Sequence, residues 1–260
     1  MQNPPVVLAV GAHPDDIEFM MAGTLLRLGD AGCVIHMWNI ADGRCGSVEP
    51  DGDGIAAIRL TEARASAGHA GAVLHLPVAE DILILYEPSL IRRTAAVIRE
   101  VAPDIILAPS PDDYMEDHRN ASRLVANAAF VRGMPNFVTA PPLPPVSGDI
   151  AVYHALPYGL RDDMRRIVRP GMFVDIEPVM DRKRAMLTCH ESQRIWLDMS
   201  QGVGSYIGHM ERMAGEVADW SGRYRFAEGW RRHLHLGLGP ERYDPLSRIL
   251  DGSCMTVPDD

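Results

Sequence analysis

Residues 9–19, AVGAHPDDIEF, place a histidine and two adjacent aspartates directly after a short apolar run. Imidazole and carboxylate groups are common ligands of zinc and similar divalent ions, and His13 and Asp16 could act together across this turn. A catalytic metal site needs a third protein ligand and an open position for water, for which His118 is the best candidate. Asp15 would then be the general base, because a metal lowers the pKa of its bound water toward ~7.

A purely structural role for the two aspartates is the alternative. Asp15 and Asp16 precede a helical pattern at 18–32, and Asp-Asp-x-Glu resembles a capping box that binds the first backbone N–H groups of a helix. Taken alone, the motif favours neither interpretation. A second acidic loop with a histidine, SPDDYMEDHRNA at 110–121, shifts the balance toward a metal site.

The elements that must position these residues alternate between buried strands and amphipathic helices. The run VVLAVGA is continuously apolar, as in a strand that is covered on both faces. By the same reasoning, strands are predicted at 6–12, 33–41, 73–78, 104–110, 151–157 and 172–176, and helices at 18–32, 54–72, 89–103, 179–197 and 206–224. This alternation predicts an α/β fold, a Rossmann-like, doubly wound and mainly parallel sheet sandwiched by helices.

Three polar clusters fall at the carboxyl ends of predicted strands, where such sheets bind their ligands. They are the His-Asp motif, the Gly- and Asp-rich loop 41–54, and the acidic loop 110–121. We therefore expect the loop clusters to converge on one site.

Composition limits the class of protein. The 260 residues are 47% hydrophobic and 23% charged, which suits a single domain over 1–260, with a core at about 6–197 and a C-terminal helix and tail at 198–260. A net charge of −10 argues against nucleic acid and anionic membranes as partners. Because the four cysteines lack C-x-x-C spacing, we expect a reduced, cytoplasmic protein in which Cys45 alone is exposed.

Several motifs of the sequence together resemble those of a known family. The motif AHPDDIEF, a later Asp-His pair at a strand end and K-x-x-x-x-x-x-H-x-S-Q together resemble the LmbE-like, or PIG-L, zinc-dependent de-N-acetylases. The resemblance runs from about residue 6 to residue 197. It implies Zn²⁺ (or another divalent transition metal), a small amino-sugar substrate and a homo-oligomer.

The resemblance also assigns residues. It places the metal ligands on His13, Asp16 and His118, and the general base on Asp15. Arg59 would bind polar groups of the substrate. By its position, Asp117 would support the metal site as an outer carboxylate. Three residues of the second motif, Lys183, His190 and Gln193, fall on recurring family positions.

One position departs from the family pattern. The family has H-x-D-H at its second metal loop, whereas this chain has Met115 at the first of those positions. A methionine can serve neither as an imidazolium near an oxyanion nor as the acid for a leaving amine. Tyr114, His154 and His190 are the candidates to replace it, and the sequence does not choose among them.

The predicted function is a metal-dependent amidohydrolase that removes an N-acetyl group from an N-acetylglucosamine-type sugar or conjugate, by attack of metal-bound hydroxide. Alternatives that stay open are deacylation of a thiol-sugar conjugate or a glycosylated antibiotic, and a non-catalytic sugar-binding protein. Dinucleotide binding ranks last, because GAHPDD has one glycine where G-x-G-x-x-G has three.

Overall fold

The sheet is built around a strand that is apolar on both faces, β1 (Val6–Gly11). Val7 and Ala9 point into one hydrophobic core, and Leu8 and Val10 into the other. This alternation is the period of two that a strand imposes on its side chains. The strand is therefore buried between two layers of helices, as the apolar run predicted.

The computed structural model describes residues 3–47, 51–201 and 206–257, so residues 48–50 of the predicted loop 41–54 lie outside it. The other strands are β2 (Val34–Asn39), β3 (Val73–His75), β4 (Ile105–Ala108), β5 (Ala151–Ala155), β6 (Met172–Asp175), β7 (Ala227–Arg232) and β8 (Cys254–Thr256). The helices are α1 (Asp16–Met20), α2 (Ala22–Asp30), α3 (Gly52–Ala70), α4 (Pro88–Val101), α5 (Glu116–Val131), α6 (Met180–Thr188), α7 (Glu191–Gln201), α8 (Tyr206–Ser221) and α9 (Pro245–Ile249), with 3₁₀ turns η1 (Tyr158–Leu160) and η2 (Glu177–Val179).

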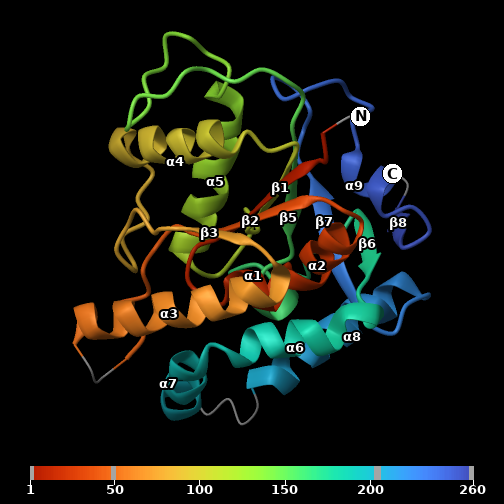
Figure 1. The fold of residues 1–260 in the computed structure, drawn as a ribbon. Coiled ribbons are helices and arrows are strands. Elements are labelled where there is room, and N and C mark those ends of the chain that lie inside the picture. The colour runs from red at the N-terminus through yellow and green to blue at the C-terminus, as the bar shows by residue number, and fades with distance from the viewer. Residues whose placement is uncertain (1–2, 48–50, 202–205, 258–260) are drawn as a thin grey trace.

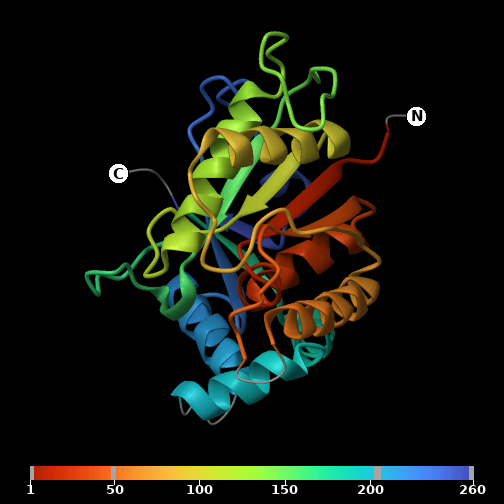
Figure 2. The ribbon, with the colours of Figure 1, turned by 90° about the vertical axis from the view of Figure 1, so that its left-hand side faces the viewer.

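The eight strands found among the described residues form one sheet in the order β3-β2-β1-β4-β5-β7-β6-β8. The five strands from β3 to β5 are parallel, whereas β7 runs antiparallel to β5 and β6, and β8 antiparallel to β6. Helices α4 and α5 cover one face, and α3, α6 and α8 lie on the other (Figures 1 and 2). The predicted α/β fold with a mainly parallel sheet is confirmed.

The predicted helix 18–32 is in fact two helices. Met21, between α1 and α2, has a non-helical φ of −134°. The Glu228 carboxylate accepts hydrogen bonds from the backbone N–H groups of Gly23 (2.8 Å) and Thr24 (2.7 Å), and so caps α2 from a distant strand. The sequence pattern could not reveal this break, because its cause lies in β7.

A second predicted helix, 179–197, is also interrupted. α6 ends at Thr188 and α7 begins at Glu191. Between them His190 is fully buried, and its Nε2 lies 3.1 Å from Glu18 Oε1. The chain thus turns where His190 enters the interior.

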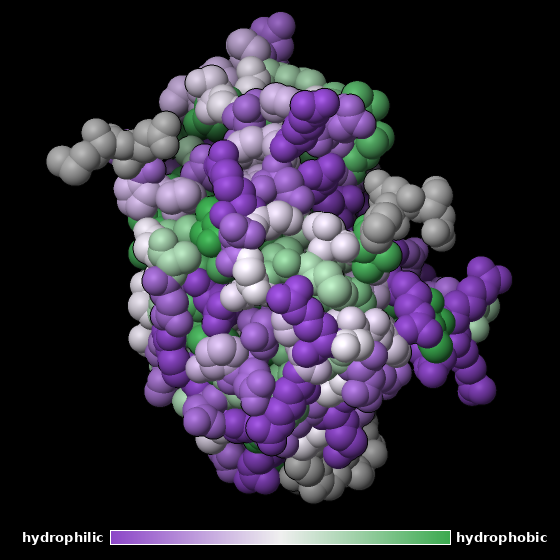
Figure 3. Space-filling view, turned by 90° about the vertical axis from the view of Figure 1, so that its right-hand side faces the viewer, coloured by the Kyte–Doolittle hydropathy of each residue, from purple (hydrophilic) through white to green (hydrophobic). Residues whose placement is uncertain are grey.

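The C-terminal segment is part of the sheet. β7 lies between β5 and β6, and β8 forms the edge next to β6. The segment expected as a tail therefore pairs with the rest of this chain. No helix in the described ranges combines the length and apolar character needed to cross a membrane, and hydrophilic side chains cover most of the face seen in Figure 3. All four cysteines are free, and Cys45 alone is exposed, as predicted.

A buried ion pair joins the C-terminal strands to the N-terminal half. Lys183 Nζ lies 2.5 Å from Glu228 Oε1 and donates to the Phe19 carbonyl at 2.9 Å. Lys183 is 1% exposed and Glu228 4%. A charge buried this deeply needs its partner, because removing one member leaves the other unpaired in the interior.

Replacing Lys183 with methionine should therefore lower the free energy of unfolding by about 3–5 kcal/mol. Arg182→Met on the same helix is the control, because Arg182 pairs with Asp30 at the exposed surface and should contribute less than about 1 kcal/mol. Urea unfolding measures both. Equal, small changes in the two variants would contradict a structural role for the buried pair.

Candidate active site

The loops after the parallel strands open into one cavity of about 310 Å³. The segments after β1, β2, β3, β4 and β5 all contribute to its lining, and α7 closes one side. The predicted convergence of loop clusters at the carboxyl ends of the strands is therefore observed. Of the residues predicted for the site, the cavity is lined by His13, Asp15, Asp16, Arg59, Tyr114 and His118.

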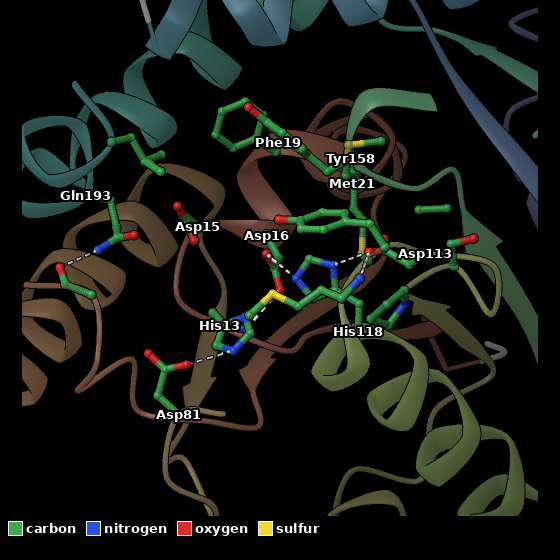
Figure 4. Close-up of a pocket in the computed structure, with 18 of the residues that line it drawn as sticks. His13, Asp15, Asp16, Phe19, Met21, Asp81, Asp113, His118, Tyr158 and Gln193 are labelled. Carbon is green, nitrogen blue, oxygen red and sulfur yellow. Dashed lines mark hydrogen bonds and ion pairs between the residues drawn. The ribbon is translucent and has the colours of Figure 1, made fainter. Parts of the chain in front are cut away.

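The three predicted metal ligands come together at the floor of this cavity (Figure 4). His13 Nδ1 lies 3.7 Å from Asp16 Oδ2, and His118 Nε2 lies 3.4 Å from Asp16 Oδ1. One ligand atom from each residue lies within 4.8 Å of the other two. Two imidazoles and one carboxylate suit a divalent transition metal and leave coordination positions for water and substrate.

Carboxylates hold the opposite nitrogen of each imidazole. His118 Nδ1 lies 3.0 Å from Asp113 Oδ1, and His13 Nε2 lies 3.0 Å from both Asp117 Oδ2 and Asp81 Oδ1. Such partners fix the tautomer and orientation of a metal-binding histidine and raise its basicity. The structure thus places the predicted Asp117 behind His13 and adds two carboxylates that were not predicted.

His13, Asp81 and Asp117 could also be grouped as a metal site. Their carboxylates are already occupied, however: Asp117 accepts the N–H of Ile82 at 2.8 Å, and Asp81 that of Cys45 at 3.2 Å. These bonds anchor both carboxylates to the loops, and His13 Nε2 is met by the same Asp117 oxygen, Oδ2, and by the other Asp81 oxygen, Oδ1. The arrangement favours orientation of His13 over a separate ion.

The same contacts set the protonation of the cluster without metal. Burial lowers the pKa of His13, but the hydrogen bonds to Asp117 and Asp81 outweigh it and raise that pKa to about 9. Burial would raise the pKa of Asp16, but the charges of His118 and His13 hold it well below its usual range. Burial also lowers the pKa of His118, but the nearby Asp16 and Asp113 outweigh it and raise that pKa. Binding of a metal would therefore release protons from both imidazoles.

Asp15 has an unusual backbone and a side chain held from two directions. Its φ is 113°, in a region that residues other than glycine rarely adopt, and its side chain does not cap α1. Arg59 Nη2 lies 3.3 Å from Asp15 Oδ1, and the Tyr206 hydroxyl donates to Oδ2 at 2.5 Å. Burial raises the pKa of Asp15, although Arg59 acts in the opposite direction. The capping interpretation is wrong for this carboxylate.

Arg59 is buried and bonded mainly to the chain itself. It donates to the carbonyls of Gly43 at 3.0 Å and Pro14 at 2.5 Å, in addition to its contact with Asp15. Gly43 has a φ of +74°, and a Cβ there would collide with the guanidinium. Arg59 therefore joins the loop after β1 to the loop after β2 while it also lines the cavity. Its role in binding substrate, implied by the resemblance, stays a prediction.

Only one of the three candidates to replace the family histidine faces the cavity. Met115 and Tyr114 both line it, and the Tyr114 ring centroid lies 5.9 Å from that of His118. His190 instead pairs with Glu18 in the interior. His154 is buried outside the cavity lining, where its Nε2 lies 2.9 Å from a nitrogen of His233.

Several residues at the site were missed by sequence analysis. Asp113 belongs to the acidic loop after β4, and Asp81 follows β3, so the rule that ligands bind at strand ends could have suggested both. Tyr206 and Tyr158 carried no such signal. They reach the site only because α8 and η1 pack against the N-terminal half.

The metal-ligand motif, the outer carboxylates and the fold together define a family. Residues 8–129 match the family model described as PIG-L: GlcNAc-PI de-N-acetylase. Residues 8–129 therefore form a PIG-L/LmbE family domain, and the resemblance stated from the motifs is confirmed.

Two deacetylases and one hydratase illustrate the range of proteins that this chain is similar to in sequence or in fold. The chain is 29% identical to diacetylchitobiose deacetylase of Thermococcus kodakarensis over 241 residues, which cover 86% of this chain and 82% of that one. The structure of the N,N'-diacetylchitobiose deacetylase of Pyrococcus horikoshii matches with a TM-score of 0.74 and 25% identity, covering 94% and 89%. GalB, the 4-carboxy-2-hydroxymuconate hydratase of Pseudomonas putida, matches with a TM-score of 0.75, covering 88% and 96%; at 22% identity it bears on the fold alone.

Stability should depend on pH through His154. Burial lowers its pKa from 6.5 to about 4, so the folded protein binds fewer protons than the unfolded chain in that window. The contribution of His154 to the free energy of unfolding is therefore fully present above pH 6.5, and it is lost as the pH falls through 4. Between pH 7 and 4.5, wild type should lose about 2 kcal/mol more than His154→Gln.

Urea unfolding at the two pH values tests this expectation. His69→Gln is the control, because His69 is exposed on α3 and should keep the wild-type pH dependence. An identical loss of stability in wild type and His154→Gln would refute the assignment of a neutral, buried imidazole.

Proposed function

We propose that this protein is a zinc-dependent N-deacetylase acting on an N-acetylglucosamine-type sugar or conjugate. The observation that carries the proposal is the grouping of His13, Asp16 and His118 around one point, with the Asp15 carboxylate lining the same cavity. Two relatives named as diacetylchitobiose deacetylases support both the reaction and the class of substrate. A sugar-binding protein would have no use for a buried carboxylate next to a metal.

The donor set favours zinc as the metal. Zinc is commonly bound in hydrolases by two histidines and one carboxylate, with further positions open. Bound there by His13, Asp16 and His118, the ion would polarise the amide carbonyl and acidify a water. Asp113, Asp117 and Asp81 would keep both imidazoles in the correct orientation.

The chain itself supplies the proton transfers. Asp15 would take a proton from the attacking water as the new C–O bond forms. It would then pass that proton to the amide nitrogen as the C–N bond breaks, releasing acetate and a free amine. Met115 offers no acid for this step, so Asp15 acts both as base and as acid.

Tyr114 is the group we assign to the carbonyl oxygen of the substrate. Burial and the nearby Asp16 charge raise the pKa of its hydroxyl, which therefore stays protonated and can donate a hydrogen bond. It lines the cavity next to His118. Tyr114 would thus take the role of the family histidine, whose position Met115 occupies in this chain.

An aromatic wall, defined as Tyr114, Tyr158 and Phe19, supports a cyclic substrate. The Tyr114 and Tyr158 ring centroids lie 6.2 Å apart, and those of Tyr158 and Phe19 5.4 Å apart. All three residues line the cavity. The electron-rich face of an aromatic ring attracts the C–H groups on the apolar face of a pyranose. The wall therefore suits a sugar ring whose N-acetyl group reaches the metal site.

Metal-stripped protein with zinc restored should release acetate from N-acetylglucosamine or N,N'-diacetylchitobiose. Asp15→Asn should lower kcat by about 10²–10⁴-fold, because general base catalysis contributes that much, and His118→Ala should also lose bound zinc. Asp112→Asn is the control, since Asp112 pairs with Arg231 at the surface. Full activity in Asp15→Asn would exclude it as the base, whereas one zinc per chain without acetate release would exclude these substrates.

Tyr158→Leu should raise KM for the cyclic sugar about 2- to 10-fold, the equivalent of one aromatic contact, with little change in kcat. Tyr158→Phe keeps the ring and should behave like wild type. The open-chain alditol of N-acetylglucosamine supplies the substrate control, because it has no ring to stack. An equal rise in KM for both compounds would argue against stacking on the wall.

A further inference from the structure

We propose that Tyr206, on α8, is a positioning residue that holds the Asp15 carboxylate in its working orientation. The inference rests on the proposed function, because it assigns a role in the reaction for which Asp15 is the base. It also goes beyond the matched family region, since Tyr206 lies 77 residues past its end at residue 129.

The contact is short and enclosed. The Tyr206 hydroxyl donates to Asp15 Oδ2 at 2.5 Å, and Tyr206 is 2% exposed. Its ring packs edge-on against Phe19 with centroids 4.8 Å apart, so the phenol has a fixed direction. Burial and the Asp15 charge also raise the pKa of the phenol, which keeps its proton on the donor side.

Asp15 needs such a support for two reasons. Its backbone is strained, with φ at 113°, and its carboxylate makes no capping bond to the backbone of α1 that would hold it. Its Oδ1 has a longer contact, 3.3 Å, with Arg59, and the like-charged Asp16 is its neighbour (Figure 4). A carboxylate held on both oxygens presents its free lone pairs to the cavity in one orientation. This matters because a small displacement of a general base lowers the reaction rate strongly.

Tyr206→Phe removes the hydroxyl and keeps the ring. We expect kcat for acetate release to fall about 10- to 100-fold, as for other groups that orient a reacting residue. KM should stay within about twofold, because Tyr206→Phe keeps the ring that packs against Phe19 of the aromatic wall. Zinc content should stay at one per chain, because Tyr206 lies outside the cavity lining. This split between kcat and KM would not arise from a merely structural loss.

Tyr153→Phe is a matched control. Tyr153 is fully buried and donates to Asp244 Oδ1 at 2.6 Å, a second tyrosine–aspartate bond outside the cavity lining. It should lose stability but keep its kcat. The proposal is overturned if Tyr206→Phe keeps kcat within twofold of wild type, or if Tyr153→Phe loses as much kcat.

A double-mutant cycle separates this proposal from the proposed function. Urea unfolding of Tyr206→Phe, Asp15→Ala and the double variant needs no turnover. Non-additive changes in the free energy of unfolding support the contact between Tyr206 and Asp15. If wild type released no acetate from any N-acetyl sugar, the proposed reaction would fail, and non-additivity would still support the contact. Additive changes would overturn the positioning role.

Discussion

The site depends on the Asp16 carboxylate. Its Oδ2 accepts the backbone N–H groups of Ala12 and His13 at 2.9 and 2.8 Å, and so holds the turn that follows β1. The same carboxylate lies within 4 Å of both imidazoles. Burying a carboxylate is costly without such partners. One residue therefore closes the turn and brings His13 and His118 to a common point.

Residues from the second half of the chain support the turn after β1 and the helices that follow it. α8 supplies Tyr206 to Asp15, and Lys183 and Glu228 join α6 and β7 to the start of α2. The family model ends at residue 129, before all of these residues. The same fold occurs in a hydratase and in deacetylases, so the fold does not decide the reaction. The decision lies in the groups around the metal position.

Much of the fold and the central part of the site could be predicted. The strands were predictable because a buried parallel strand is continuously apolar. The grouping of His13 and Asp16 with His118 was predictable because all three lie at the carboxyl ends of parallel strands. The breaks at Met21 and His190 could not be predicted, since each is caused by a buried partner far along the chain. Zinc, a homo-oligomer and a cytoplasmic location stay predictions from the sequence.

The sequence by itself determined the chemistry that is local: two imidazoles and adjacent carboxylates at strand ends, and a methionine at the position where the family pattern it resembles has a histidine. Only the tertiary structure decided which polar residues reach that chemistry. It brought Asp81 and Asp113 to the cavity, set Tyr206 against Asp15 from outside the cavity lining, and kept His154 and His190 out of that lining. Periodicity tells which face of an element is buried, but the partner of a buried polar group is chosen by packing between distant elements.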